Sequence, residues 1–114
     1  MIVPDNAELF TAIGAVYLKV GHIDGALENF NIAMNHDSSF NNALLGAASI
    51  YQDKYEFESA LIKYKLASTT NPNSPLVWNN LGLCFFAKQK YVAAVTCLKR
   101  AIYLDPFEWI ISYN

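Results

Sequence analysis

Hydrophobic residues along the chain recur at the spacing of one face of an α-helix. Trp78, Leu81, Gly82 and Phe85 stand at positions i, i+3, i+4 and i+7, and apolar residues follow at the same spacing between positions 94 and 101. Each set falls on one side of a helix, because one turn takes about 3.6 residues. The whole pattern predicts six helices, over residues 7–20, 24–37, 41–53, 57–70, 75–88 and 91–104.

This pattern occurs three times, with a period of 34 residues and no insertion. Only a short break separates the two predicted helices of each copy, which is typical of a helical hairpin with a short turn. The eight matching columns are Phe10, Leu44 and Trp78; Ile13, Ala47 and Leu81; Gly14, Ala48 and Gly82; Tyr17, Tyr51 and Phe85; Ala26, Ala60 and Ala94; Phe30, Tyr64 and Leu98; Ala33, Ala67 and Ala101; and Pro4, Ser38, Pro72 and Pro106.

Small residues recur where the two helices of a hairpin would meet. Gly82 and Ala94 in the third copy let the helices approach closely, and the larger columns fill the space between hairpins. A single hairpin cannot bury this face alone, so neighbouring copies must stack. We therefore expect an all-α fold, an α-solenoid of three helical hairpins and a partial fourth helix. The expected units are residues 1–6 (end of a preceding repeat), 7–40, 41–74, 75–108 and 109–114 (start of a following repeat).

Both ends of the chain continue the repeat. Pro4 stands in the column of the closing prolines, and residues 109–114 carry the apolar side chains Trp109, Ile110, Ile111 and Tyr113 in place of a polar cap. The pattern is typical of a segment cut from a longer array. We expect such ends to be adhesive, so that the chain self-associates at high concentration.

These columns resemble the tetratricopeptide repeat: a large residue, Leu-Gly and Tyr, then Ala, Phe, Ala and Pro, every 34 residues. The resemblance covers residues 7–108. Copy three is the fullest match, and copy one departs from the pattern at Ser38. The resemblance implies a fold of stacked hairpins whose task is protein–protein interaction.

Three strings of copy three go beyond the general repeat pattern. Residues 84–86 (Cys-Phe-Phe), 90–94 (Lys-Tyr-Val-Ala-Ala) and 97–101 (Cys-Leu-Lys-Arg-Ala) closely resemble a repeat-containing subunit of the BBSome, a coat complex. The resemblance implies a non-enzymatic coat subunit that helps to carry membrane proteins to and from cilia. It also implies other coat subunits as partners, and a cytoplasmic location at basal bodies and centriolar satellites.

Composition and charge narrow the classes of protein to which the chain can belong. The chain has 114 residues, of which 54% are hydrophobic and only 16% are charged, yet no apolar run approaches the ~20 residues that a membrane span needs. The net charge of −2 argues against general nucleic-acid binding. It hides an asymmetry, since residues 1–53 carry six acids and one base while residues 54–114 carry four acids and seven bases.

The concave groove of such a solenoid is lined by the first helix of each hairpin. Helical phase directs a set of side chains into it, and Asn79 and Asn80 are suited to hydrogen-bond a peptide backbone while Leu83 and Phe86 offer apolar contacts. Two interpretations stay open: the groove holds a partner, or these residues face water or the solenoid's own later turns. The full set is Thr11, Ala15, Leu18, Lys19, Asn42, Leu45, Ser49, Gln52, Asp53, Leu76, Asn79, Asn80, Leu83 and Phe86.

One known groove chemistry is not expected. Some tetratricopeptide co-chaperones grip an acidic C-terminal tail with Lys, Arg and Asn side chains, because a terminal carboxylate needs several cationic or amide donors. The matching positions here are Thr11, Ala15, Gly46, Leu76 and Asn80, of which only Asn80 conforms. We therefore expect no such clamp.

Basic residues gather on the second helices and one turn, which places them on the convex side or an edge. This basic edge either contacts anionic lipid headgroups or an acidic partner subunit, or it is simply a solvated face. Any membrane contact would be indirect, through the coat. The residues are Lys63, Lys65, Lys88, Lys90, Lys99 and Arg100.

Catalytic and metal chemistry find no support in the sequence. Cys84 and Cys97 fall on apolar helix faces and form no Cys-x-x-Cys motif, and neither His22 nor His36 has a second ligand at metal spacing. No Gly-rich phosphate loop or nucleophile motif is present. We expect no enzyme activity, no cofactor and no metal.

Three hypotheses about function follow. The first is an interaction scaffold in a BBSome-like coat, and the second is a peptide-recognition module of another complex. The third is the substrate-presenting arm of a larger enzyme whose catalytic domain lies elsewhere.

Overall fold

The computed structural model describes residues 6–105, which form six α-helices. Each helix begins and ends within one residue of the bounds expected from the sequence. The helices are α1 (Asn6–Lys19), α2 (Ile23–His36), α3 (Asn41–Asp53), α4 (Phe57–Thr70), α5 (Pro75–Ala87) and α6 (Tyr91–Leu104).

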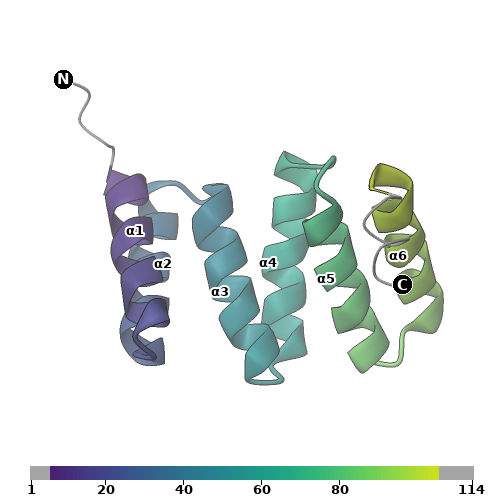
Figure 1. The fold of residues 1–114 in the computed structure, drawn as a ribbon, viewed down its shortest axis with the longest axis horizontal. Coiled ribbons are helices and arrows are strands. Elements are labelled where there is room, and N and C mark those ends of the chain that lie inside the picture. Colours follow the sequence, from purple (N-terminus) through teal and green to yellow (C-terminus); the bar gives the residue numbers. More distant parts are fainter. Residues whose placement is uncertain (1–5, 106–114) are drawn as a thin grey trace.

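The helices form three antiparallel hairpins that stand side by side in chain order, from α1 at one end to α6 at the other (Figure 1). The prediction of an all-α solenoid is confirmed for the described residues, which contain no strand. Asn6 already belongs to α1, whereas the repeat pattern assigns it to the end of a preceding repeat. The expected remainder of that preceding repeat, residues 1–5, and the start of a following repeat at 109–114 lie outside the described residues.

The turn of each hairpin has the same backbone conformation. Gly21, Tyr55 and Gln89 occupy one column of the repeat, and all three have positive φ angles, of 84°, 62° and 63°. The amide of the residue after each one donates to the carbonyl five residues earlier, at 2.9, 2.8 and 2.9 Å. This satisfies helix-end carbonyls in the manner of a Schellman motif. A left-handed residue at the turn therefore fixes the angle between the two helices of every copy.

The start of α5 follows the sequence expectation. The Ser74 hydroxyl accepts a hydrogen bond from the Val77 amide at 3.4 Å, and Pro75 takes the first helical position. The indole nitrogen of Trp78 donates to the Pro72 carbonyl at 2.7 Å. These contacts tie the loop after α4 to the first turn of α5, and so set where the third hairpin begins.

One aromatic side chain from α2 and one from α4 fill the two joints between hairpins. Phe30 of α2 is 2% exposed and packs with Ala43, Ala47 and Ile50 of α3. A Cβ atom added to Gly46 would lie 2.6 Å from the Phe30 ring, so the ring lies directly against the α3 backbone. The first joint therefore depends on a large residue on α2 and small residues on α3.

Tyr64 of α4 occupies the equivalent place at the second joint. It is 1% exposed and packs with Leu81 and Cys84 of α5. Its hydroxyl donates to Gln52 Oε1 at 2.7 Å, so the buried polar atom is satisfied. Burial raises the pKa of the Tyr64 phenol above its usual range. The two joints thus share a buried aromatic ring, but Tyr64 meets the larger Leu81 where Phe30 meets Ala47.

The small residues at the helix crossings give a test of this packing. Ala60 on α4 is fully buried, so we expect Ala60→Leu to force its neighbours apart and to lower the free energy of unfolding by roughly 1–3 kcal/mol. Urea unfolding followed by circular dichroism measures this. Ala87→Leu, at an exposed alanine of α5, is the matched control and should change stability by less than about 0.5 kcal/mol. Equal effects of the two variants would contradict the packing account.

Candidate partner-binding groove

A hollow of about 470 Å³ lies between α1 and α3, on the side of the solenoid formed by the first helices. Small residues make room for it, since Ala12, Ala15 and Gly46 stand where larger side chains would fill the space. Phe30, held against the backbone of Gly46, contributes to its wall. Its complete lining is Glu8, Thr11, Ala12, Ala15, Leu18, Phe30, Phe40, Asn42 and Gly46.

A second hollow, of about 420 Å³, lies beside the turns at the lower end of the same two hairpins. Leu18 lines both hollows, so they adjoin along α1. The lining of the second hollow is Leu18, Gly21, His22, Ile23, Asp24, Ile50, Asp53 and Lys54. We call the two hollows together the α1–α3 groove.

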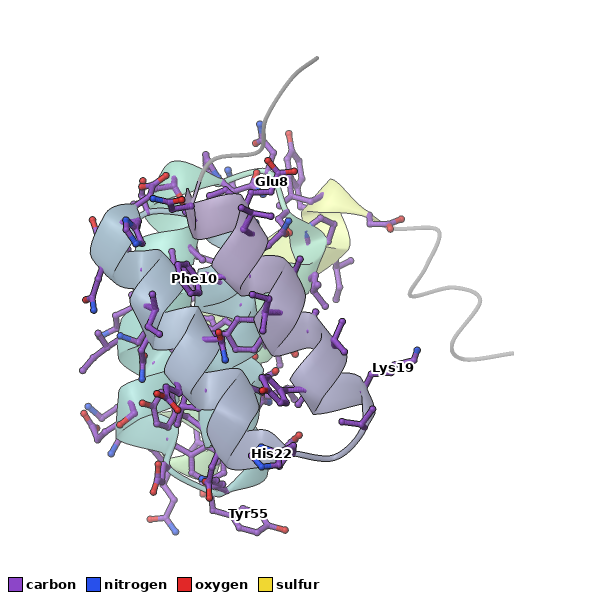
Figure 2. The ribbon with its side chains drawn as sticks, turned by 90° about the vertical axis from the view of Figure 1, so that its left-hand side faces the viewer. Glu8, Phe10, Lys19, His22 and Tyr55 are labelled. Carbon is purple, nitrogen blue, oxygen red and sulfur yellow. The ribbon has the colours of Figure 1, made fainter. Side chains whose placement is uncertain are left out.

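The α1–α3 groove combines an apolar lining with acidic residues. Glu8 lines the first hollow, and Asp24 and Asp53 line the second beside a single base, Lys54. Figure 2 shows Glu8 near the upper end of α1 and His22 at the lower turn. Such a groove is suited to bulky apolar side chains accompanied by positive charge, because opposite potentials favour encounter and register.

His22 has a structural role that the sequence did not indicate. Its Nδ1 accepts a hydrogen bond from the Gly25 amide at 3.0 Å, which caps the start of α2, and its ring packs at a tilt on Tyr17. His36 stacks on Phe10 at a centroid distance of 5.7 Å. The signal that was missed is positional: His22 precedes a helix start, the place where side-chain acceptors satisfy free amides.

The structure divides the groove residues expected from the first two repeats. Asn42 is exposed and lines the first hollow, and Lys19 points into solvent (Figure 2). Leu45, by contrast, is half-buried against the core, and Gln52 accepts the Tyr64 hydrogen bond. Thr11 is buried, with its hydroxyl donating to the Ala7 carbonyl at 2.6 Å. Thus Leu45, Gln52 and Thr11 act in part inside the fold.

The groove positions of the third hairpin are more accessible. Leu83 and Phe86 of α5 are 44% and 60% exposed, and Asn79 and Asn80 are half-buried. Phe86 meets Tyr91 edge-on at 5.8 Å, which directs its ring toward the turn before α6. These four residues lie outside the two hollows of the α1–α3 groove.

Several residues of the expected basic edge have partners within the chain. Lys88 forms an ion pair with Glu58, and the hydrogen bond from Lys88 lowers the pKa of the Glu58 carboxyl. Lys65 lies over the Phe85 ring, 5.5 Å from its centroid, and Arg100 lies over Trp78 at 5.8 Å. Lys90 and Lys99 are exposed, and Lys63 is half-buried. Half of the set therefore contributes to joints between elements.

The two thiols are buried. Cys84 is fully buried and Cys97 is 6% exposed. Burial raises the pKa of the Cys84 thiol to about 11, and it also raises the pKa of Cys97. Within residues 6–105 no group of three or more His, Cys, Asp and Glu side chains is placed to hold a metal ion. Among the same residues, no helix is long and apolar enough to cross a membrane.

Comparison with known proteins agrees with this architecture. The family model described as tetratricopeptide repeat matches residues 75–107. The first tetratricopeptide repeat domain of Spaghetti (RPAP3), solved with the HSP90 peptide SRMEEVD, superposes with a TM-score of 0.83 at 25% identity, over 90% of this chain and 81% of that one. Residues 75–107 thus match the tetratricopeptide repeat, and the described helices share the fold of a solved tetratricopeptide repeat domain.

Two mammalian relatives are more similar in sequence. The chain is 45% identical to the BBSome complex member BBS4 of Bos taurus and 47% identical to that of Mus musculus, in each case over 97% of this chain. It spans about a fifth of the length of these relatives, 21% in both. Because the identity extends over nearly all of the chain, the resemblance to these relatives is not confined to residues 75–107, which match the repeat model.

The burial of the cysteines predicts their reactivity. We expect both thiols to react with iodoacetamide far more slowly in the folded chain than in the urea-unfolded chain, because only the exposed thiolate is nucleophilic. Mass spectrometry of timed samples at pH 8 measures this. The contribution of the thiols to stability should be constant below about pH 8.5 and fall above it, because the folded state keeps protons that the unfolded thiols release. Fast labelling without unfolding would contradict this burial.

Proposed function

We propose that this chain is a scaffold segment of a BBSome-type coat, which takes part in ciliary membrane-protein trafficking and cilium assembly. The observation that carries the proposal is the 45–47% identity to mammalian BBS4 along 97% of the chain. The fold supports it, because stacked hairpins present long surfaces for other subunits. In this function the chain works by surface complementarity, without catalysis or a cofactor.

The α1–α3 groove is the best supported partner site. Its two hollows adjoin at Leu18, and together they offer pockets for two or more bulky side chains of an extended or helical segment. Asn42 supplies an exposed amide for the backbone of that segment. Asp24 and Asp53 favour a segment that also carries Lys or Arg. The partner is therefore a basic, apolar stretch of another coat subunit.

The location follows from the same proposal. A BBSome-type scaffold acts in the cytoplasm at the base of the cilium, at basal bodies and centriolar satellites. Contact with membrane is then indirect, through the assembled coat. Lys90 and Lys99 are the exposed members of the basic edge that are available for such a contact or for an acidic subunit.

A segment exchange tests the function. The matched segment of mouse BBS4 is replaced by this chain, and the chimaera is expressed in ciliated cells that lack BBS4. We expect the chimaera to co-purify the other BBSome subunits at a level within about twofold of wild type, because this chain is 47% identical to the segment that it replaces. Quantitative mass spectrometry of the purified complex measures this. A chimaera that recovers no more subunits than a deletion of the segment would overturn the proposal.

The groove is tested within the same chimaera. Ala15→Trp fills the first hollow from an exposed position, and Ala87→Trp places the same ring on an exposed alanine outside both hollows. If the groove holds a partner, the first variant should lose one or more subunits and the second should not. Loss of the same subunits in both variants would contradict groove binding.

A peptide titration separates this groove from that of a co-chaperone. The RPAP3 domain is seen with the peptide SRMEEVD, but here Thr11, Ala15, Gly46 and Leu76 stand at the positions of the carboxylate clamp, which leaves only Asn80. We expect the Kd for SRMEEVD to exceed about 1 mM by calorimetry, because acidic groove residues repel the peptide and no cationic side chain stands at the clamp positions. The RPAP3 domain is the positive control. Micromolar binding by this chain would contradict the expectation.

A further inference from the structure

The second helix of the middle hairpin carries apolar side chains on its outward side. Ile62 and Leu66 of α4 are 62% and 38% exposed, and they stand about one helical turn apart. Residues two positions apart point to nearly opposite sides of a helix, so Ile62 faces away from the core that buries Ala60 and Tyr64. Tyr55, which is 81% exposed, projects from the turn before α4 (Figure 2). We call Tyr55, Ile62 and Leu66 the α4 strip.

The exposure of the α4 strip does not depend on where the chain begins or ends. The helix α4 packs against α3 and α5, and its hairpin has a neighbouring hairpin on each side. The column of Ile62 is exposed in every copy, since Glu28 and Thr96 occupy it in the other two. The geometry of the hairpin itself therefore turns this column toward solvent.

Only the middle copy carries an exposed apolar side chain in all three columns of the strip. The fold does not require Ile62, because the polar residues Glu28 and Thr96 serve in its place on α2 and α6. Tyr55 adopts a positive φ of 62°, which costs a tyrosine more than the glycine that stands there in the first copy. Exposed apolar side chains that gather on one side of an element, unlike single ones, mark contact surfaces.

Positive charge surrounds the α4 strip. Residues 59–104 contain six bases and no acid. Two of these bases flank Ile62 on α4, with Lys65 about 60° to one side around the helix axis and Lys63 about 100° to the other. Glu58, about one turn before Ile62, forms an ion pair with Lys88, so it adds little net charge. A complementary partner surface is therefore apolar at its centre and acidic at its edges.

A helix of a protein fits this surface better than a membrane does. Ile62 and Leu66 form an i, i+4 ridge, which packs into the groove between the side chains of a second helix. Electrostatic attraction to a membrane uses clusters of about four to eight Lys or Arg residues. Only two lysines flank the α4 strip on its own helix, and one of them, Lys65, lies over the Phe85 ring.

We propose that the α4 strip binds an acidic amphipathic helix of a partner protein. The apolar side of that helix packs on Ile62 and Leu66, and its carboxylates meet Lys63 and Lys65. This partner is opposite in charge to the basic segment proposed for the α1–α3 groove, and no residue of α4 lines either hollow. Both surfaces are thus available at the same time. The inference goes beyond the proposed function and does not need the groove to be occupied.

Peptide selection on the 114-residue chain tests the α4 strip. The probe is a displayed library of peptides of about 20 residues, long enough to form a helix, in which apolar and charged positions vary. Ile62→Gln removes the apolar contact but keeps a good helix former, and Thr96→Gln is the matched change in the same column of α6. We expect a set of peptides that bind the chain and the Thr96→Gln variant but not the Ile62→Gln variant. Those peptides should carry apolar residues at helical spacing and more Asp and Glu than Lys and Arg.

A second measurement tests the charges. For the most enriched of these peptides, fluorescence anisotropy should show that Lys63→Glu combined with Lys65→Glu raises the Kd at least about tenfold. Lys90→Glu combined with Lys99→Glu alters the net charge equally at exposed lysines outside α4, and should raise the Kd less than about threefold. Circular dichroism must show the same helix content in all variants. If the first pair unfolds the chain, the fall in binding with added salt tests the charges without a substitution.

The absence of peptides that depend on Ile62 would overturn the proposal, and so would a set that is neutral or basic. An equal rise of the Kd in the two charge-reversed variants, or binding that does not respond to salt, would contradict the role of Lys63 and Lys65. Vesicles of phosphatidylcholine and phosphatidylserine are the remaining probe. If they bind the chain and lose that binding with Ile62→Gln, the α4 strip contacts membrane and the partner helix is wrong.

Discussion

The joints of the structure depend on a buried aromatic ring from a second helix, which at the first joint is pressed against small residues of the next first helix. Phe30 against Gly46 and Ala47 is the clearest case, because the ring lies where a Cβ of Gly46 would be. The Phe30 ring fixes the separation of the first two hairpins. Its removal would leave a cavity in the core between them. The same crossing leaves space on the groove side, where Ala12 and Ala15 line a hollow. Cohesion and the partner groove thus have a common origin.

The fold was predictable because its determinants are local and are repeated. Each position of the repeat occurs three times in the sequence, so its place in a helix could be inferred from three residues and not from one. The helix bounds agree with the pattern to within one residue. The turns were predictable in place but not in conformation. Tyr55 and Gln89 adopt positive φ like Gly21, although nothing in their chemistry favours it, because the geometry of the hairpin imposes that conformation.

The candidate groove was only partly predictable. Helical phase identifies which side of a first helix faces outward, and this placed Asn42, Leu83 and Phe86 correctly on the accessible surface. It does not identify where two helices diverge enough to leave a hollow, which depends on how Phe30 and Gly46 pack. It also does not show that Gln52 is engaged by Tyr64, or that Lys65 and Arg100 lie over aromatic rings. Those contacts join different elements, so no single periodicity reveals them.

The chain-order arrangement has a consequence for how the molecule opens. The main contacts of each helix are with its sequence neighbours, so folding needs few long loop closures, and stability is close to a sum over hairpins and joints. The middle hairpin, α3 and α4, is supported by joints on both sides, while each outer hairpin has only one among the described residues. Protection of the backbone amides from hydrogen exchange should therefore increase from the outer hairpins toward the middle hairpin. Contacts that cover an outer hairpin would also raise the protection of the hairpin next to it. The resistance of each hairpin to local opening therefore reflects how many neighbouring hairpins it packs against.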